Sequence, residues 1–240
     1  MTHVLLPAIV LLGSSVQWLT GMGFALVAVP ALVLLLGPAD GVVLANCASG
    51  AICAVGLGTG WRHIRLTAMV PLCVAAACTV PAGTWLTRQL PEPVLLLVMG
   101  GLVTAAVVLV MRGARIPALR GRRGAVAAGA AGGFMNAAAG VGGPPVSLYA
   151  LNAGWTVREF VPNAMFYGVI VNAFSVASNG IPHLTGTQWA SVVTAMLVGG
   201  LIGRALAGRL PEERARLLVL ALALAGGLTT VAKGLWGLPL

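Results

Sequence analysis

Residues 132–145 read GGFMNAAAGVGGPP and lie inside a stretch, 124–157, that contains no Asp, Glu, Lys or Arg. Glycine adopts backbone conformations that other residues avoid, and proline has no amide hydrogen, so the run Gly-Gly-Pro-Pro at 142–145 predicts an interruption between two helices. Such an interruption exposes free N–H groups, which attract anions. At membrane depth it is tolerated only where it is buried in protein or lines an aqueous cavity. The segment therefore predicts a substrate site or, alternatively, a close helix-packing contact.

The rest of the chain has the composition of an integral membrane protein. Of its 240 residues, 59% are hydrophobic and 8% are charged, and the mean hydropathy is +0.99. Soluble domains carry roughly 25% charged residues, so 14 basic and 5 acidic side chains are too few to cover a soluble surface. The basic residues cluster between long uncharged stretches, which indicates a lipid bilayer as partner and argues against nucleic acid.

The uncharged stretches predict an all-α polytopic membrane protein with about 8–10 hydrophobic segments, since a transmembrane helix needs about 20 apolar residues. Solid apolar runs such as 95–99 do not fit the alternating pattern of an outer-membrane barrel. Residues 1–19 lack the basic start of a signal peptide, so we expect them to form the first segment. Single segments are expected in 41–61, 66–87, 93–111 and 217–232, and pairs in 1–39, 124–157 and 160–203.

Arginine placement predicts the orientation. The most basic loop contains no acidic residue, so we expect it in the cytoplasm. Its basic residues are Arg112, Arg115, Arg120, Arg122 and Arg123. Counting outward places the loops at 62–65, 158–159 and 214–216 inside, and Asp40, Arg88 and the His183 loop outside. Both termini are then expected on the outer side of the membrane.

We predict two inverted repeats with broken helices: a first membrane repeat at 1–112, a basic cytoplasmic linker at 113–123 and a second membrane repeat at 124–240. An offset of 120 residues aligns 60–97 with 180–217, with Leu-Pro-Glu at 90–92 and again at 210–212. The matched positions in this window include Gly83/Gly203 and His63/His183, and upstream Gly21-Met22-Gly23 matches Gly140-Val141-Gly142 and Gln17 matches Asn136. Five segments per half would place the halves in opposite senses, as in many secondary transporters. Chance similarity of composition is the alternative.

The sequence at 140–145, preceded by Asn136, and the weaker Gly21-Met22-Gly23 followed by Pro30 resemble the paired motifs of the TauE/SafE sulfite exporter family. The resemblance covers nearly the whole chain. It implies a bacterial inner-membrane carrier that moves sulfite, sulfonates or related small anions, usually outward. By motif position it implies substrate-binding roles for Gly21, Gly23, Gly140, Gly142, Gly143, Pro144 and Pro145. The first half has Phe24 where the second has Gly143, so the site is expected to be asymmetric.

Polar residues inside apolar segments add further substrate-binding candidates, because such residues are costly in a membrane. Asn136 and Asn163 lie beside an interruption or a segment start. Asn172 shares a helix face with Ser175 and Asn179, as Asn46 does with Ser49 and Cys53. We therefore add Asn136, Asn163 and Asn172 to the predicted site; ordinary interhelical hydrogen bonds, worth about 0.6 kcal/mol each, are the alternative.

Several other polar residues have two interpretations. Tyr149 and Tyr167 are hydroxyl donors or interfacial residues. Arg204 is an anion ligand or a side chain that snorkels to the interface. His63 and His183 fit ordinary interfacial positions.

No enzymatic motif is evident. The four cysteines lack CxxC spacing, and no metal-binding, nucleophile-elbow or Walker pattern is present. We therefore expect no catalysis, no metal and no cofactor, and predict a secondary transporter of a small anionic substrate. A membrane scaffold or assembly factor and an anion channel are the alternatives. A homo-oligomer is possible, since Gly129/Gly133 and Gly199/Gly203 permit close helix contacts within or between chains.

Overall fold

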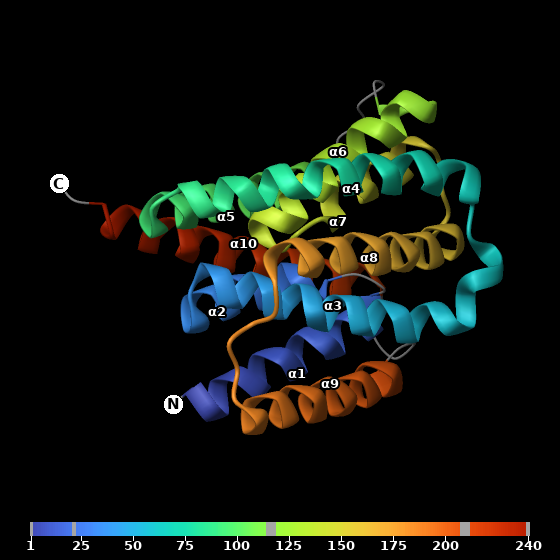
Figure 1. Ribbon diagram of the computed structural model, residues 1–240. Helices are drawn as coiled ribbons and strands as arrows, with labels where there is room; N and C mark the ends of the chain where they lie inside the picture. The colour runs from blue at the N-terminus through green and yellow to red at the C-terminus, as the bar shows by residue number, and fades with distance from the viewer. Residues whose placement is uncertain (1, 21–22, 114–118, 207–211, 239–240) are drawn as a thin grey trace.

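The structure is a computed structural model that describes residues 2–20, 23–113, 119–206 and 212–238. This part of the chain is helical and contains no strand (Figure 1). Its elements are α1 (Thr2–Thr20), α2 (Phe24–Leu36), α3 (Pro38–Gly60), the 3-10 turn η1 (Trp61–His63), α4 (Leu66–Gln89), α5 (Glu92–Met111), α6 (Gly121–Ala139), α7 (Gly143–Asn152), α8 (Val157–Asn179), α9 (Gly186–Leu206) and α10 (Glu212–Trp236). Six of these helices, namely α3, α4, α5, α8, α9 and α10, are long and apolar enough to cross a membrane. The predicted all-α polytopic class is confirmed.

The helix boundaries follow from local sequence. Pro38 occupies the first position of α3, where its missing amide hydrogen costs no helical hydrogen bond. α8 starts with a capping box, in which the side chains of Thr156 and Glu159 accept each other's backbone N–H groups. α6 begins at Gly121, so the last three residues of the predicted linker, 121–123, belong to a helix.

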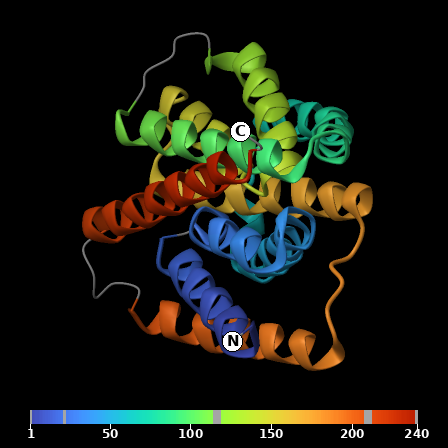
Figure 2. The ribbon, with the colours of Figure 1, turned by 90° about the vertical axis from the view of Figure 1, so that its left-hand side faces the viewer.

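Four helix pairs form the body of the molecule: α1 with α9, α4 with α6, α5 with α10 and α3 with α8. Figure 2 shows α1 against α9 at the bottom of the view and α6 beside α4 at the top. If the halves are repeats, α1 corresponds to α6 and α4 to α9. Each half then packs the helix before its interruption against the fourth helix of the other half.

Two aligned glycines lie at these contacts. A Cβ atom added to Gly83 of α4 would collide with Phe134 and Ala137 of α6, and one added to Gly203 of α9 would collide with Ser15 and Trp18 of α1. Equivalent positions in the sequence therefore make equivalent close contacts in the two pairs. This agrees with the repeat hypothesis, which stays a prediction.

An ion pair and a hydrogen-bonded pair join the halves at the helix ends. Arg65, before α4, pairs with Glu159 in the first turn of α8. Asp40, in the first turn of α3, pairs with His183 in the loop before α9, with 3.0 Å between Oδ1 and Nδ1. The topology prediction puts Arg65 and Glu159 on one side of the membrane and Asp40 and His183 on the other, so each pair joins loops expected on the same side.

Candidate functional site

The interruption in the second half is built by two glycines. α6 ends at Ala139, and Gly140 follows with φ +68°, a left-handed conformation that glycine adopts without strain. A Cβ atom here would also lie 2.9 Å from Val29 of α2. Gly142 caps α7, which starts at Gly143 with prolines behind it. Glycine is thus required at 140 by both backbone angle and space.

Asn136, in the last turn of α6, connects this interruption to two other helices. Its Oδ1 accepts a hydrogen bond from the N–H of Gly142 at 3.1 Å. Its Nδ2 lies 3.3 Å from Oδ1 of Asn46, 3.1 Å from Oδ1 of Asn172 and 2.9 Å from Oγ of Ser175. We call these five residues the Asn136 network. Because one NH2 group has two hydrogens, three acceptors share two donors.

The first half uses a similar device. Oε1 of Gln17, in the last turn of α1, accepts a hydrogen bond from the N–H of Phe24 at 3.0 Å. Gln17 is the residue that the repeat alignment matches with Asn136. In each half, a side-chain amide of the longer helix therefore caps the start of the shorter one. The expectation of free N–H groups is wrong for Phe24 and Gly142, because these carboxamides satisfy them.

Both interruptions line one central cavity of about 740 Å³. This volume lies within the range of about 300–1,000 Å³ that is typical of small-molecule sites. Gly23 lines it from the first half, and Gly142, Gly143 and Pro144 line it from the second. The polar side chains in its wall include Gln17, Ser49, Asn136, Ser147, Tyr167 and Asn172.

The described part of the cavity wall contains no charged side chain. Its polarity comes from carboxamides, hydroxyls, indoles and the N-termini of α2 and α7. A helix N-terminus carries about half a positive charge, so these two termini bring positive potential to the cavity. Arg204 does not line the cavity but contacts a residue that does: its guanidinium carbon lies 3.9 Å from the ring centre of Trp18.

The cavity extends toward the end of the molecule where Arg65 meets Glu159. Its wall there includes Gly60 at the end of α3, Leu151 at the end of α7 and Trp155 before α8. The guanidinium of Arg65 stacks on the far part of this wall, 5.7 Å from the ring centre of Trp155. The cavity therefore reaches from the two interruptions to the Arg65–Glu159 ion pair.

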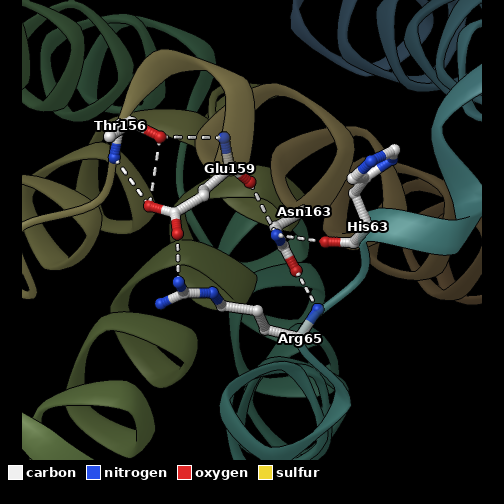
Figure 3. A network of polar contacts seen from close by, with 5 residues as sticks. All are labelled: His63, Arg65, Thr156, Glu159 and Asn163. Carbon is white, nitrogen blue, oxygen red and sulfur yellow. Dashed lines mark hydrogen bonds and ion pairs between the residues drawn. The ribbon is translucent and has the colours of Figure 1, made fainter.

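Asn163 belongs to this ion-pair cluster (Figure 3). Its Oδ1 accepts the backbone N–H of Arg65 at 2.8 Å, and its Nδ2 donates to the carbonyls of His63 at 3.3 Å and Glu159 at 2.6 Å. The Glu159 carboxylate also accepts the N–H and hydroxyl of Thr156, at 2.9 Å and 3.1 Å. The side chain of Asn163 thus joins α8 to the segment that connects η1 with α4.

Comparison with known proteins assigns the family. A family model described as Sulfite exporter TauE/SafE matches residues 5–230. The chain belongs to the TauE/SafE family. This TauE/SafE chain is accordingly a multi-pass membrane protein of a family that transports sulfur anions, and that family is not enzymatic. No curated protein and no solved structure matches it.

The TauE/SafE motif residues do not all lie at the cavity. Six of the predicted site residues line it: Gly23, Asn136, Gly142, Gly143, Pro144 and Asn172. Among the described residues of the wall, Gly140, Pro145 and Asn163 are absent, and Gly21 lies outside the residues that the structure describes. Gly140 shapes the turn and Asn163 joins helix ends.

Sequence reasoning did not place Gln17, Ser49 or Tyr167 in the site, although each lines the cavity of this TauE/SafE chain. Gln17 was detectable through its match with Asn136. Ser49 shares a helix face with Asn46, which the sequence offers either as a pathway lining or as an interhelical contact, and it was not added to the site. Tyr167 had only its hydroxyl as a signal, and nothing in the sequence tells which way that hydroxyl points.

Proposed function

We propose that this TauE/SafE protein is a secondary transporter that exports small sulfur oxyanions, sulfite or organosulfonates, across a bacterial inner membrane. The anion binds in the central cavity, between the start of α2 and the start of α7. One observation carries the proposal: two short helices, one from each half, begin at the same cavity. Helix N-termini favour anions through their dipoles and their N–H groups.

The packing of the halves supports alternating access as the mechanism. The helix before each interruption packs against a helix of the other half: α1 packs against α9, and α6 packs against α4. Inverted repeats that exchange helices in this way can rock against each other around a fixed site. The carboxamides of Gln17 and Asn136 keep the interrupted backbone satisfied while the site is empty, which lowers the cost of the interruption.

Flux measurements test the proposal. The purified full chain, reconstituted in vesicles, is expected to move sulfite or methanesulfonate faster than protein-free vesicles, with saturation at high anion concentration. Gly143→Val is expected to abolish flux and to leave membrane insertion normal. Gly143 lines the cavity at the start of α7, so a valine side chain there would keep the anion from approaching the backbone. Gly101→Ala is the matched control, since a Cβ atom at Gly101 meets nothing within 4 Å.

The same experiment separates the other functions. Sustained single-channel currents would indicate a channel. A correctly inserted protein that moves none of these anions would indicate a scaffold and contradict the proposal. Unchanged flux in Gly143→Val would place the anion elsewhere.

A further inference from the structure

We infer that the hydroxyls of Tyr167 and Ser49 donate hydrogen bonds to the transported oxyanion, for example hydrogensulfite or an alkanesulfonate. The inference rests on the proposed function and adds two binding residues to it. Tyr167 lies on α8 of the second half and Ser49 on α3 of the first. Each half would thereby contribute one helix N-terminus and one hydroxyl.

Tyr167 supports this role by its position. Its side chain is 2% exposed and lines the central cavity, and its hydroxyl has no hydrogen-bond partner among the described residues. The hydroxyl lies at the α6–α7 interruption: a Cβ atom added to Gly132 would collide with it and would lie 2.9 Å from the carbonyl oxygen of Gly142. Because Gly132 has no side chain, the Tyr167 hydroxyl fits beside the start of α7.

Ser49 supports it from the other half. Its hydroxyl is also buried without a partner among the described residues, and Ser49 lines the same cavity at 9% exposure. Ser49 follows Asn46 by one helical turn on α3, and Asn46 donates to the main-chain carbonyl of Asn136 at 3.4 Å. Ser49 therefore belongs to the α3 face that meets the Asn136 network.

Unsatisfied buried hydroxyls lower stability, because each has lost water without gaining a partner. Thr84 and Thr104 share this state in the described part of the chain, but neither lines the cavity. Neighbouring atoms cover both hydroxyl oxygens of Tyr167 and Ser49 in the structure. A small turn of each side chain toward the cavity would let an anion supply the missing acceptor, and hydrogen bonds to a charged acceptor are about twice as strong as neutral ones. The dipoles of the two helix N-termini add positive potential at the cavity, which favours an anion there.

The test measures anion affinity and anion-free stability in the same purified full-chain protein. Methanesulfonate and sulfite are titrated, and binding is followed by the shift of the melting temperature. Tyr167→Phe removes the hydroxyl and keeps the ring. It is expected to raise the dissociation constant for methanesulfonate about tenfold or more, since a hydrogen bond to a charged group is lost. Its anion-free melting temperature is expected to stay equal or rise, because an unsatisfied hydroxyl is removed.

Two controls isolate the effect. Tyr149→Phe removes the hydroxyl of the other tyrosine, which packs edge-on against Trp155 and is not part of the described cavity wall. Thr104→Val removes an unpartnered buried hydroxyl away from the cavity. Both are expected to keep the wild-type dissociation constant. Ser49→Ala provides an independent second test and is expected to weaken methanesulfonate binding as well.

The outcomes are distinguishable. Wild-type affinity in Tyr167→Phe would overturn the assignment of Tyr167 and leave the proposed function intact; if that variant does not fold, wild-type affinity in Ser49→Ala overturns the inference instead. A wild-type protein that is stabilised by neither anion and moves neither in vesicles would overturn the proposed function and the inference together.

Discussion

Asn136 belongs to the cavity wall and also holds helices together. Its side chain is 3% exposed and joins α6 to α3, to α8 and to the backbone before α7. A carboxamide suits this position because it carries both an acceptor for the Gly142 N–H and donors for neighbouring oxygens. An aspartate would keep the acceptor but lose the donors.

Asn136→Ala is therefore expected to destabilise the protein by about 2–4 kcal/mol. The variant leaves the Gly142 N–H without its acceptor, which costs about 1–3 kcal/mol, and removes interhelical bonds worth about 0.6 kcal/mol each. Unfolding in one detergent measures the effect. Asn179→Ala is the control: Asn179 donates to the carbonyl of Ala137 at 3.3 Å, and the loss is expected to stay below about 1 kcal/mol. Equal losses in the two variants would contradict a central role for the network.

At this scale the sequence identifies polar residues in apolar segments but not their partners. Asn136 and Asn172 were predicted because they are polar residues within apolar segments, and both line the cavity. Asn163 has the same signature, yet its polar groups are used at a helix end. Helical spacing gives the face of a residue, whereas its depth and its partner depend on how distant helices pack.

Small residues decide how closely the helices approach. Gly129 and Gly133 of α6 face α4, where a Cβ atom on either would collide with the carbonyl of Leu72 or Ala76. Gly199 and Gly203 of α9 face α1 in the same way. The sequence left open whether these glycines serve contacts within or between chains. In the described structure they pack helices of one chain against each other.

Gly133→Ala is expected to destabilise the α4–α6 pair, because backbone atoms of Ala76 cannot move aside without separating the helices. Overpacking of this kind typically costs about 1–3 kcal/mol. Gly101→Ala on α5 is the matched control, since nothing lies within 4 Å of its added Cβ atom. It should be neutral or stabilising by up to about 1 kcal/mol, as alanine favours helix. Loss of stability is read from the melting temperature, and a Gly133→Ala variant as stable as Gly101→Ala would disprove the close contact.

Helix ends were predictable where charge or proline bounds an apolar run. The expected segments 66–87 and 93–111 correspond to α4 at Leu66–Gln89 and α5 at Glu92–Met111. The last segment, expected at 217–232, extends to Glu212–Trp236, because charged residues at a membrane boundary can continue a helix. The interruption at 140–142 was visible from glycine and proline. The carboxamide caps were not, since they depend on tertiary geometry.

Across the whole molecule, the Arg65–Glu159 ion pair and the Asp40–His183 contact lie between the halves at different helix ends. In Figure 1 the start of α1 and the end of α10 lie at the left, and η1, next to Arg65, lies at the right. The positive-inside rule assigns the right-hand end to the cytoplasm. A reporter enzyme fused after Leu240 is therefore expected to be active outside the cytoplasm, and one inserted after Arg112 inside. Cytoplasmic activity of the terminal fusion would refute the count.

With that orientation, we expect the cavity to be reached from the cytoplasmic side. Its wall extends toward the Arg65–Glu159 end and includes Leu151, which is 48% exposed. A Leu151→Cys variant, made after Cys47, Cys53, Cys73 and Cys78 are replaced by alanine, is expected to react with a membrane-impermeant maleimide added from the cytoplasmic side. His183→Cys in the same background is the reference for the other end, since the His183 side chain is 91% exposed.

Methanesulfonate at saturating concentration is expected to slow labelling of Leu151→Cys severalfold and to leave His183→Cys unchanged, because only Leu151 lines the cavity through which the anion would reach its site between the starts of α2 and α7. Labelling is counted by mass spectrometry of intact protein after fixed times on inside-out and right-side-out vesicles. Reaction of Leu151→Cys solely from the outer face would reverse the predicted orientation. Equal labelling rates with and without the anion would separate this cavity from the transport path, since a transported anion must pass through and occupy the space that the reagent enters.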